Sequence, residues 1–429
     1  MTKKIIADKK LTAPNKRELI QQMLQLGLSH HQNGQLRESK TVYEDILRLE
    51  PKHFDATHLL GVIALTANQP NTAVLLISKA LEIRKTKDAF FNYGLALQAN
   101  RQPLLAIDAY KKAIALNPKE DKYYWNKALS LLQTGNFVEG WPLYEFGWKG
   151  SKQRGIELNT NKPLWLGSEE LNGKTILLHS EQGLGDTIQF CRYATLVKEM
   201  GANVLLSIPK ELVSLMTRLS GVDEVLVQGD SLPTFEYHCP LLSLPQAFKT
   251  TIKTIPKKHS YLQAEILKID IWKSRLGVKN KKRIGLVWSG SSAHKKDTTR
   301  SLTLQELLPF LPKDYEYVSL QKEVRESDKD VLATSGIKHF GEQLKDFTDT
   351  AALCELMDIV ISVDTSVAHL AGALGKTTWI MLPYSPDWRW LLDRDDSPWY
   401  PTVKLYRQDK IGDWSAVLKK MKSDLIHLA

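Results

Sequence analysis

The sequence predicts an α + α/β protein, in which a solenoid of helical repeats precedes two domains with parallel, doubly wound sheets. Over the first third of the chain, small residues recur 33 to 34 positions apart, at Gly27, Gly61 and Gly94, as in stacked helical hairpins. After residue 172, short apolar segments alternate with helical ones, and this alternation starts again after residue 280. Strands that alternate with helices are typical of parallel sheets covered by helices.

The repeat pattern has three recurring features. The first helix of each copy carries a small residue, at Gly27, Gly61, Gly94 and Ala128. The turns between helices carry Gly34, Asn68-Gln69, Asn100-Arg101 and Gly135. The second helices carry a large residue, at Tyr43, Ile77, Tyr110 and Tyr144. Because these positions recur in phase, the pattern resembles the tetratricopeptide repeat over residues 20–148, after an N-terminal extension over 1–19.

The last copy of the repeat is atypical. It has Gly140 where alanine is usual, and it adds Trp141 and Trp148. Terminal repeats depart from the consensus where one face meets something other than another repeat. We expect the following domain to cover this face. The groove of such an array normally holds a partner, and the alternative is a spacer that only fixes geometry.

Residues 149–171 are predicted to be a linker, because glycine and proline recur there with little periodicity. An N-terminal α/β domain is expected over 172–280 and a C-terminal one over 281–429. The strands expected in the first are Thr175–His179, Asn203–Ile208 and Glu224–Val227. Those expected in the second are Ile284–Trp288, Glu316–Leu320, Ile359–Val363, Thr378–Leu382 and Val403–Tyr406, before a last helix over Trp414–Leu425. Two such Rossmann-like domains facing each other form the arrangement called GT-B, with ligands beyond the carboxyl ends of the strands.

Composition and charge limit the function. The 429 residues are 43% hydrophobic and 25% charged, which suits a globular protein of two or three domains. No apolar stretch is long enough to span a bilayer, and no signal peptide is expected. Cys191, Cys239 and Cys354 form no CxxC pair, which indicates a reducing compartment and no structural zinc. We therefore expect a cytoplasmic protein.

The formal net charge of +10 raises the question of an anionic partner. The basic residues are dispersed, and neither zinc-finger spacing nor a ribonucleoprotein motif is present, so nucleic acid is not expected. A solvated basic surface is the main interpretation. Attraction to anionic substrates and peripheral contact with the inner membrane leaflet are the alternatives.

Two loops at predicted strand ends carry candidate functional residues. The first, HSEQGLGDTIQF over 179–190, contains Glu181, Gln182, Gly183, Gly185 and Asp186. Its glycines permit a sharp turn close to a ligand, and Asp186 begins a helix, either facing the cleft or as a plain N-cap. The sequence has no GxGxxG fingerprint, which disfavours a nicotinamide-dependent oxidoreductase.

The second loop is VISVDTSVAHLAGALGK, over 360–376. A buried strand runs into Asp364, Thr365 and Ser366, and a helix with His369 one turn later follows. A helix N-terminus with nearby hydroxyl groups suits a diphosphate. The alternatives are that Thr365 and Ser366 are caps and that His369 is a packing residue. Gln321, after the Glu316–Leu320 strand, is a further candidate or an ordinary loop residue.

The runs EQGLGDTIQFCRY, GLVWSGSSAHKKDTTRSL, ISVDTSVAHLAGALGK and LPYSPDWRWLLDRDDSPWYPT resemble bacterial tetratricopeptide-repeat proteins with a glycosyltransferase family 9, heptosyltransferase-like, domain. This resemblance covers essentially the whole chain. It implies that Asp186 is the catalytic base and that Asp364, Thr365 and Ser366 bind the sugar and diphosphate of the donor. It also implies a phosphate loop, matched loosely by Ser289, Gly290, Ser291 and Arg300, with Lys295 or Lys296 as possible substitutes.

The activity implied is that of an inverting, metal-independent glycosyltransferase that uses a nucleotide-sugar as substrate and no cofactor. The acceptor, a protein or a cell-surface glycan, would be selected by the repeats. The DRDD segment, residues 393–396, looks like a metal-binding motif, but GT-B enzymes generally need no metal, so no metal site is expected. Trp388, Trp390 and Trp399 either line the cleft or pack beside it. The alternative function is a scaffold that binds nucleotide or protein partners with little or no catalysis.

Overall fold

The computed structural model describes residues 13–148, 154–155, 157–293 and 297–428. The chain forms two compact units that divide between Leu131 and Leu132. The first unit holds most of the repeats. The second holds the end of the last repeat and both α/β domains. Each unit is described by itself.

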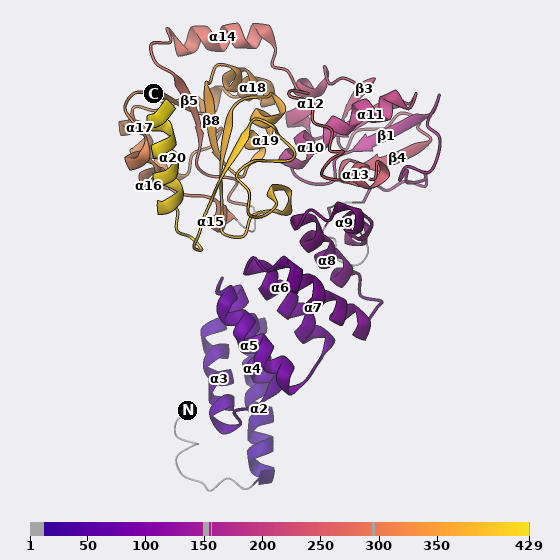
Figure 1. Cartoon of the computed structure of the whole chain (residues 1–429), viewed down its shortest axis with the longest axis vertical. Coiled ribbons are helices and arrows are strands. Elements are labelled where there is room, and N and C mark those ends of the chain that lie inside the picture. The colour runs from indigo at the N-terminus through magenta and orange to yellow at the C-terminus, as the bar shows by residue number, and fades with distance from the viewer. Residues whose placement is uncertain (1–12, 149–153, 156, 294–296, 429) are drawn as a thin grey trace. The chain divides into compact units, whose positions relative to one another are not determined.

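The repeats are antiparallel helix pairs, coloured indigo to purple in Figure 1. Their helices are α2 (Ala13–Gln32), α3 (Leu36–Leu49), α4 (Phe54–Thr66), α5 (Pro70–Ile83), α6 (Lys87–Ala99), α7 (Pro103–Leu116), α8 (Asp121–Gln133) and α9 (Phe137–Tyr144). Local sequence sets several boundaries. Pro70 and Pro103 occupy the first turn of their helices, where proline's missing N–H costs nothing. Thr86 caps α6 by accepting a hydrogen bond from the N–H of Ala89.

The predicted small and large residues meet between the paired helices. A Cβ atom added at Gly27 or Gly94 would lie 2.4 Å from the ring of Tyr43 or Tyr110, respectively. Both rings are fully buried. The predicted turns are also confirmed, because Gly34 and Gly135 adopt positive φ angles of 74° and 80°, in the region that favours glycine.

The first sheet consists of parallel strands in the order β3-β2-β1-β4. Its strands are β1 (Thr175–His179), β2 (Asn203–Ile208), β3 (Glu224–Val227) and β4 (Tyr237–Pro240). The second sheet is also parallel, in the order β10-β9-β8-β5-β6-β7. Its strands are β5 (Arg283–Val287), β6 (Glu316–Ser319), β7 (Lys338–His339), β8 (Ile359–Val363), β9 (Thr378–Leu382) and β10 (Val403–Arg407).

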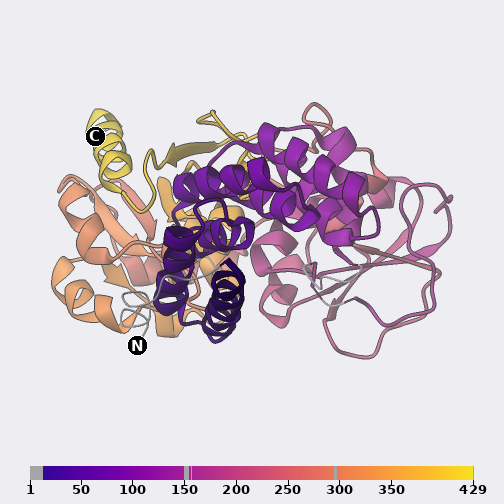
Figure 2. The same ribbon diagram turned by 90° about the horizontal axis from the view of Figure 1, so that it is seen from below.

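Helices connect the strands of both domains, which lie side by side in Figures 1 and 2. The first domain contains α10 (Leu184–Phe190), α11 (Ala194–Glu199), α12 (Lys210–Met216) and α13 (Leu244–Ala247). Later in the chain come α14 (Ile266–Leu276), α15 (Asp297–Arg300), α16 (Leu304–Leu307), α17 (Glu326–Ser335), α18 (Phe347–Glu355), α19 (Ser366–Ala373) and α20 (Ser415–Leu428). Short 3-10 turns include η2 (Cys191–Tyr193), η3 (Leu241–Ser243) and η6 (Trp388–Trp390).

The second sheet is buried on both faces. Alternate residues of its central strands, among them Ile284 and Ile361, form one core with Leu304 of α16 and Met421 of α20. Figure 1 shows α16, α17 and α20 on this side of β5 and β8, with α18 and α19 on the other. Burial on both faces explains why these strands read as continuous apolar runs.

The predicted fold class is confirmed: helical repeats precede two parallel-sheet α/β domains, consistent with GT-B. Each predicted strand is present, with ends that differ by at most one residue. Two short strands were not predicted, β4 and β7. β4 contains His238 and ends at Pro240, and β7 has only two residues, so neither has the apolar run of a buried strand.

The segment before β1 packs on the first domain. Arg154 is completely buried, and its guanidinium forms ion pairs with Glu145 at 2.7 Å and Glu181 at 3.1 Å. Trp165 is also buried, and its backbone N–H donates to the carbonyl of His238 in β4. The part of residues 149–171 that the structure describes is therefore held against the sheet by specific contacts.

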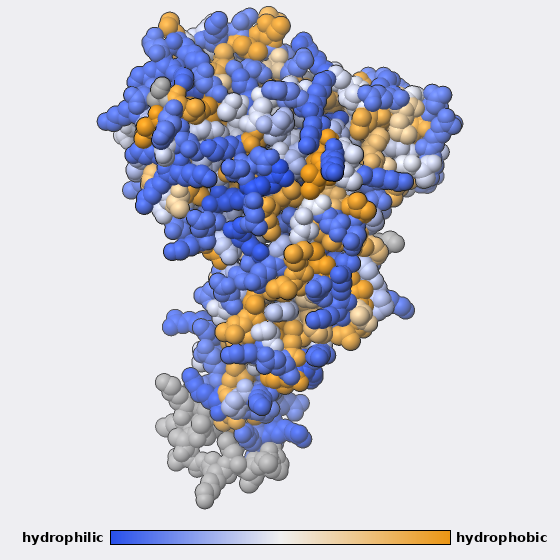
Figure 3. Space-filling model, in the orientation of Figure 1, coloured by the Kyte–Doolittle hydropathy of each residue, from blue (hydrophilic) through white to orange (hydrophobic). Residues whose placement is uncertain are grey.

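Apolar side chains also remain on the surface of the repeats. Figure 3 shows hydrophobic residues gathered over this region. The side chains of Leu75 on α5 and of Leu104 and Leu105 on α7 are each more than half exposed. Within the described part of the chain, no helix is both long and apolar enough to cross a membrane.

We predict that Gly94→Val destabilises the repeats. The added side chain would overlap the buried ring of Tyr110, and overpacking of this kind costs about 1 to 3 kcal/mol. Thermal unfolding of the full chain followed by circular dichroism should show an earlier first transition. Lys87→Val, at an exposed position of the same helix, is the matched control. Equal stability of the two variants would contradict the packing described here.

Candidate functional site

Loops from both α/β domains line a cleft of about 960 Å³. In the first sheet the strand order reverses between β1 and β4, and in the second between β5 and β8. Ligands of parallel α/β sheets bind beyond the carboxyl ends of strands at such switch points. The cleft is bordered by the loops that follow β1, β5 and β8. It therefore lies where this topology favours a ligand.

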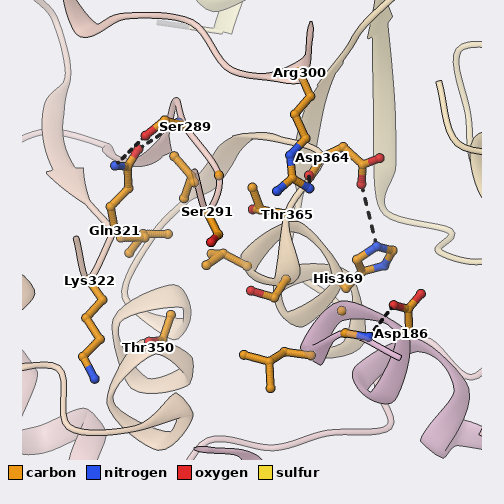
Figure 4. Close-up of a pocket in the computed structure, with 18 of the residues that line it drawn as sticks. Asp186, Ser289, Ser291, Arg300, Gln321, Lys322, Thr350, Asp364, Thr365 and His369 are labelled. Atoms are coloured by element: carbon orange, nitrogen blue, oxygen red, sulfur yellow. Dashed lines mark hydrogen bonds and ion pairs between the residues drawn. The ribbon is translucent and has the colours of Figure 1, made fainter. Parts of the chain in front are cut away.

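The cleft brings together nearly all the residues selected from the sequence. Those that line it are Gln182, Gly183, Gly185, Asp186, Ser289, Gly290, Ser291, Arg300, Gln321, Asp364, Thr365, Ser366 and His369. Figure 4 shows Asp186 on one side, from the first domain, and Asp364, Thr365 and Arg300 from the second. Lys295 and Lys296 lie outside the described residues.

Glu181 does not line the cleft. Its side chain is fully buried, pairs with Arg154 at 3.1 Å and accepts the N–H of Leu242 at 3.1 Å. Burial raises the pKa of Glu181 to about 7, against the opposing effect of Arg154. Gln182 lines the cleft, and its amide donates to the hydroxyl of Tyr144 in α9. Glu181 therefore supports the loop, and Gln182 connects it to the last repeat.

Asp186 lies in the first turn of α10. Its Oδ2 accepts the backbone N–H of Gly183 at 2.9 Å, and its Oδ1 pairs with the guanidinium of Arg389. The side chain is 23% exposed, so the carboxylate still faces the cleft. Burial raises the pKa of Asp186, and Arg389 opposes this effect. The N-cap of α10 is Gly183, so the interpretation of Asp186 as a plain N-cap is wrong. Asp186 is the third residue of the helix, accepts the N–H of the N-cap residue and lines the cleft.

Gly185 lets the two domains approach each other at the cleft. A Cβ atom at this position would lie 2.8 Å from Cδ2 of His369 and 3.5 Å from Cα of Ser366. Helix α10 therefore packs directly on the first turn of α19. This contact places Asp186 beside the loop that follows β8.

The N-terminus of α19 opens into the cleft. Thr365 has the extended backbone of an N-cap but makes no side-chain cap, and its hydroxyl lies 3.1 Å from that of Ser362. Thr365, Ser366 and Val367 all line the cleft. The first N–H groups of an α-helix have no partner within the helix and carry partial positive charge. This end of α19 can accept an anionic group.

Asp364 and His369 form a buried pair behind this helix end. The His369 Nε2 atom lies 3.8 Å from a carboxylate oxygen of Asp364, and its Nδ1 is 2.9 Å from the hydroxyl of Tyr400. Burial lowers the pKa of His369 to about 3, so the ring is neutral. Burial and the charge of Asp387 raise the pKa of Asp364 to about 6. His369 is therefore not a cation for a ligand, and at 3.8 Å its neutral ring is too far from Asp364 for a hydrogen bond.

Gln321 fixes the loop that follows β5. Its Oε1 accepts the N–H groups of Trp288 and Ser289 at 2.8 and 3.0 Å, and its Nε2 donates to the Ser289 hydroxyl at 3.2 Å. A second bond from this Nε2 goes to the carbonyl of Glu323. All the hydrogen-bonding atoms of the Gln321 amide are thus used within the protein. Gln321 therefore fixes the loop after β5, which places Ser289 and Ser291 at the cleft.

The side chain of Arg300 extends past Gly290, in the loop after β5, to the loop after β8. Its guanidinium donates to the backbone carbonyl of Asp364 at 2.9 Å and lies 3.6 Å from the carboxylate of Asp297. Gly290 makes this path possible, because a Cβ atom there would lie 2.5 Å from the guanidinium. Asp297 also pairs with Arg325. The positive charge at this end of the cleft is therefore held rigidly.

Arg389, Lys322 and Thr350 also line the cleft and were not predicted from the sequence. Lys322 follows Gln321 at the end of β6, so the strand-end rule could have found it. Arg389 lies in the WRW run, in which only the tryptophans drew attention. Thr350 lies within α18 and has no sequence signal.

The tryptophans of the same segment pack beside the cleft and do not line it. Trp390 stacks on His369 with ring centroids 5.2 Å apart. Trp388 and Trp399 pack against Phe190. In the DRDD segment, the carboxylate of Asp396 pairs with Arg394 at 2.6 Å. Among the described residues, no group of three or more histidine, cysteine, aspartate or glutamate side chains could hold a metal ion.

Comparison with known proteins shows tetratricopeptide repeats, whose family pattern matches residues 24–88 and 92–144. Protein FlbA of Caulobacter vibrioides is 25% identical over 325 residues, which cover 70% of this chain and 54% of FlbA. This chain thus spans about half the length of FlbA. It is a tetratricopeptide-repeat protein with a C-terminal α/β region of two parallel sheets, and FlbA is a distant homologue.

Solved structures match about 30% of the chain. MamA residues 41 to the end, from Desulfovibrio magneticus RS-1, is 23% identical with a TM-score of 0.28, over 31% of this chain and 75% of that one. YrrB, described as a TPR protein with an unusual peptide-binding site, is 18% identical with a TM-score of 0.28, over 30% and 72% of the two chains.

We predict that Asp364→Asn stabilises the chain at neutral pH but not in acid. A pKa of about 6 in the folded chain, against an ordinary 3.8, means that folding favours the protonated carboxyl. Wild-type stability therefore falls as the pH rises between these two values and stays level above them. The gain of the variant at about pH 7.5 relative to about pH 4 should be about 2 to 3 kcal/mol.

Urea unfolding of both proteins at the two pH values measures this difference. Asp330→Asn, at an exposed position of α17, is the control and should change stability little at either pH. A variant that gained no stability between acid and neutral pH would contradict the buried, destabilised carboxylate.

Proposed function

We propose that this protein is an inverting, metal-independent glycosyltransferase that uses a nucleotide-sugar donor. One observation carries the proposal: the Asp186 carboxylate and the uncapped N-terminus of α19 lie in the same cleft, brought together by the contact at Gly185. A base and an anion-binding helix end in one cleft suit a reaction in which a diphosphate is the leaving group. The resemblance of the sequence to glycosyltransferase family 9 points the same way.

In the proposed reaction, Asp186 accepts the proton of an acceptor hydroxyl as its oxygen attacks the anomeric carbon. The new bond from oxygen to carbon forms while the bond from that carbon to the diphosphate oxygen breaks, and the electron pair leaves with the nucleoside diphosphate. A single displacement of this kind inverts the anomeric configuration. A raised pKa makes the carboxylate of Asp186 a stronger base and so favours its uptake of the proton.

The donor diphosphate is assigned to the second domain. The N–H groups at the start of α19 and the guanidinium of Arg300 are donors that can stabilise the charge of the leaving group. Ser289 and Ser291 border the same part of the cleft. These groups supply positive charge from the protein itself, which is why the proposed reaction requires no metal ion.

The repeats are assigned to acceptor selection. Tetratricopeptide repeats bind proteins, and the exposed leucines on α5 and α7 leave apolar surface for a partner. The proposed acceptor is therefore a protein or a glycan presented near one. We propose a cytoplasmic location because Cys191, Cys239 and Cys354 are all free thiols. Peripheral contact with the inner membrane leaflet is compatible with the basic surface.

A second candidate function is a scaffold that binds nucleotide or protein partners without catalysis. It is favoured by one observation, that each oxygen of Asp186 already has a partner, Arg389 or Gly183. The two functions differ in a simple test. Melting temperatures are measured with UDP, GDP, ADP and CDP and with their sugar conjugates, and then release of the free diphosphate is followed. A scaffold would bind without releasing diphosphate, and a transferase would do both.

We predict that Asp186→Asn lowers the rate of diphosphate release by about 10² to 10⁴-fold, because the amide cannot accept the proton. The affinity for the nucleoside diphosphate found in the melting screen should stay within about threefold, which is under about 0.7 kcal/mol. Asp230→Asn, at an exposed position of the same domain, removes the same charge away from the cleft and serves as the control. A loss below tenfold would rule out Asp186 as the general base.

We also predict that donor binding and diphosphate release persist in EDTA. The positive groups that face the diphosphate belong to Arg300 and the N-terminus of α19, and a chelator removes neither. Rates are compared in EDTA and after addition of Mg²⁺ or Mn²⁺. Activity that disappeared with EDTA and returned with the metal ion would contradict the proposal.

A further inference from the structure

Arg389 is the one residue of the second domain that pairs directly with Asp186, among the ion pairs of the described residues. The aspartate belongs to α10 of the first domain, and the arginine to η6, more than two hundred residues later. Arg389 also pairs with Asp387 at 2.8 Å. A single guanidinium therefore lies between two carboxylates at the edge of the cleft.

The guanidinium of Arg389 is held in one place by aromatic rings. It is 6% exposed and lies 4.3 Å from the ring centroid of Trp388 and 5.6 Å from that of Phe190. A cation over aromatic faces is attracted to them, and here the rings also fill the space into which the side chain could turn. Arg389 is thus fixed before any ligand binds.

The last repeat helix supports this arrangement. Trp388 packs edge-on against Trp141 of α9, with ring centroids 5.4 Å apart, and against Tyr144 at 6.2 Å. Trp141 is anchored in turn by a 3.0 Å hydrogen bond from its indole N–H to the carbonyl of Thr250. The position of Arg389 therefore depends on α9 as well as on the α/β domains.

The two contacts to Asp186 set the direction of its carboxylate. Oδ2 accepts the N–H of Gly183, and Oδ1 accepts a guanidinium N–H of Arg389. A carboxylate oxygen can accept two hydrogen bonds, so each oxygen keeps a free position, and the side chain remains partly exposed to the cleft. The pair fixes the carboxylate and still leaves room for an acceptor hydroxyl.

We propose that Arg389 is the positioning residue of Asp186, whose guanidinium keeps that carboxylate ionised and oriented for proton transfer in the cleft. The role in proton transfer rests on the proposed glycosyltransferase function. The pairing itself rests only on the geometry. Without Arg389, the mostly buried carboxyl of Asp186 would lie near the charge of Asp387 and would lose its paired cation. Its protonated form is then favoured, and a protonated carboxyl cannot act as a base.

Several other titratable groups surround this pair and share its electrostatics. They are Asp387 beside Arg389, Tyr144 on α9, Glu181 on the same loop, and Asp364 and His369 on the far side of Gly185. His369 is neutral across the working range, since its pKa is about 3. Arg389 is accordingly the cation in direct contact with Asp186, among the described ion pairs.

The test compares Arg389→Gln and Arg389→Lys with wild type. Diphosphate release from the nucleotide-sugar found in the melting screen is measured as a function of pH. In Arg389→Gln, the acidic limb of kcat/KM should move upward by about one to three pH units, and activity should recover in base. Arg389→Lys keeps the charge but not the planar geometry, so its limb should stay nearer that of wild type while kcat falls.

A control variant separates this effect from a general loss of charge. Arg394→Gln removes another arginine of the same segment, one that pairs with Asp396 outside the cleft lining. Its pH profile should match that of wild type. If Arg389→Gln and Arg394→Gln shift the limb equally, or if Arg389→Gln lowers the rate by the same factor at every pH, Arg389 has no positioning role.

Direct titration of the Asp186 carboxyl tests its pairing with Arg389 even if the protein has no transferase activity. Carbon-13 NMR of labelled aspartate carboxyls follows Asp186, which is identified by the signal missing from Asp186→Asn. The pH midpoint of the Asp186 titration should rise in Arg389→Gln. In Arg389→Lys it should stay closer to that of wild type. The lysine variant provides the comparison if the glutamine variant does not fold. An unchanged midpoint in the folded variants would overturn the pairing. A shifted midpoint in a chain that releases no diphosphate would keep the pairing and reject the transferase.

Discussion

Direct contact between α10 and α19 is the constraint on which the candidate site depends. Gly185 permits this contact, and the buried Arg192 and Arg389 add hydrogen bonds between the two domains beside it. Arg192 of the first domain donates to the carbonyl of Trp399 at 2.6 Å and to the hydroxyl of Tyr261 at 2.8 Å. Arg389 makes the reciprocal contact from the second domain to Asp186. Because a buried arginine must keep its partners, separating these helices would leave uncompensated charge. The two α/β domains therefore share one preformed cleft.

This burial also sets the electrostatics of the cleft. Carboxylates at its base are destabilised, as the pKa of about 6 for Asp364 shows, and the neighbouring His369 is kept neutral. Cations are retained where they have partners, as for Arg300 with Asp297. A site of this kind has little freedom to reorganise its charges when a ligand enters. Preorganised donors of this sort stabilise developing charge without a reorganisation cost.

The end of the repeat region is built into the same unit as the cleft. The division between compact units falls within α8, and α9 packs through Trp141 against the loop that carries Arg389. Arg154, just after the repeats, ties Glu145 to Glu181 in the loop before Asp186. The last repeat helix thus contacts the loop of Arg389 and, through Tyr144 and Gln182, the loop of Asp186. This packing gives the atypical Trp141 of that repeat a structural reason.

Local patterns in the sequence determined the repeats, the strands other than β4 and β7, and the main polar residues of the cleft. Helix pairing at Gly94 and Tyr110 follows from spacing alone, and parallel strands place their terminal loops, such as those of Asp186 and Asp364, at one edge. The spacing of residues in the sequence does not show which side chains from distant segments will contact each other. The partner of Asp186 lies 203 positions away, and only the packing of the two domains decided that it would be Arg389. Folding likewise turned Glu181 away from the cleft, and its side chain pairs with the buried Arg154.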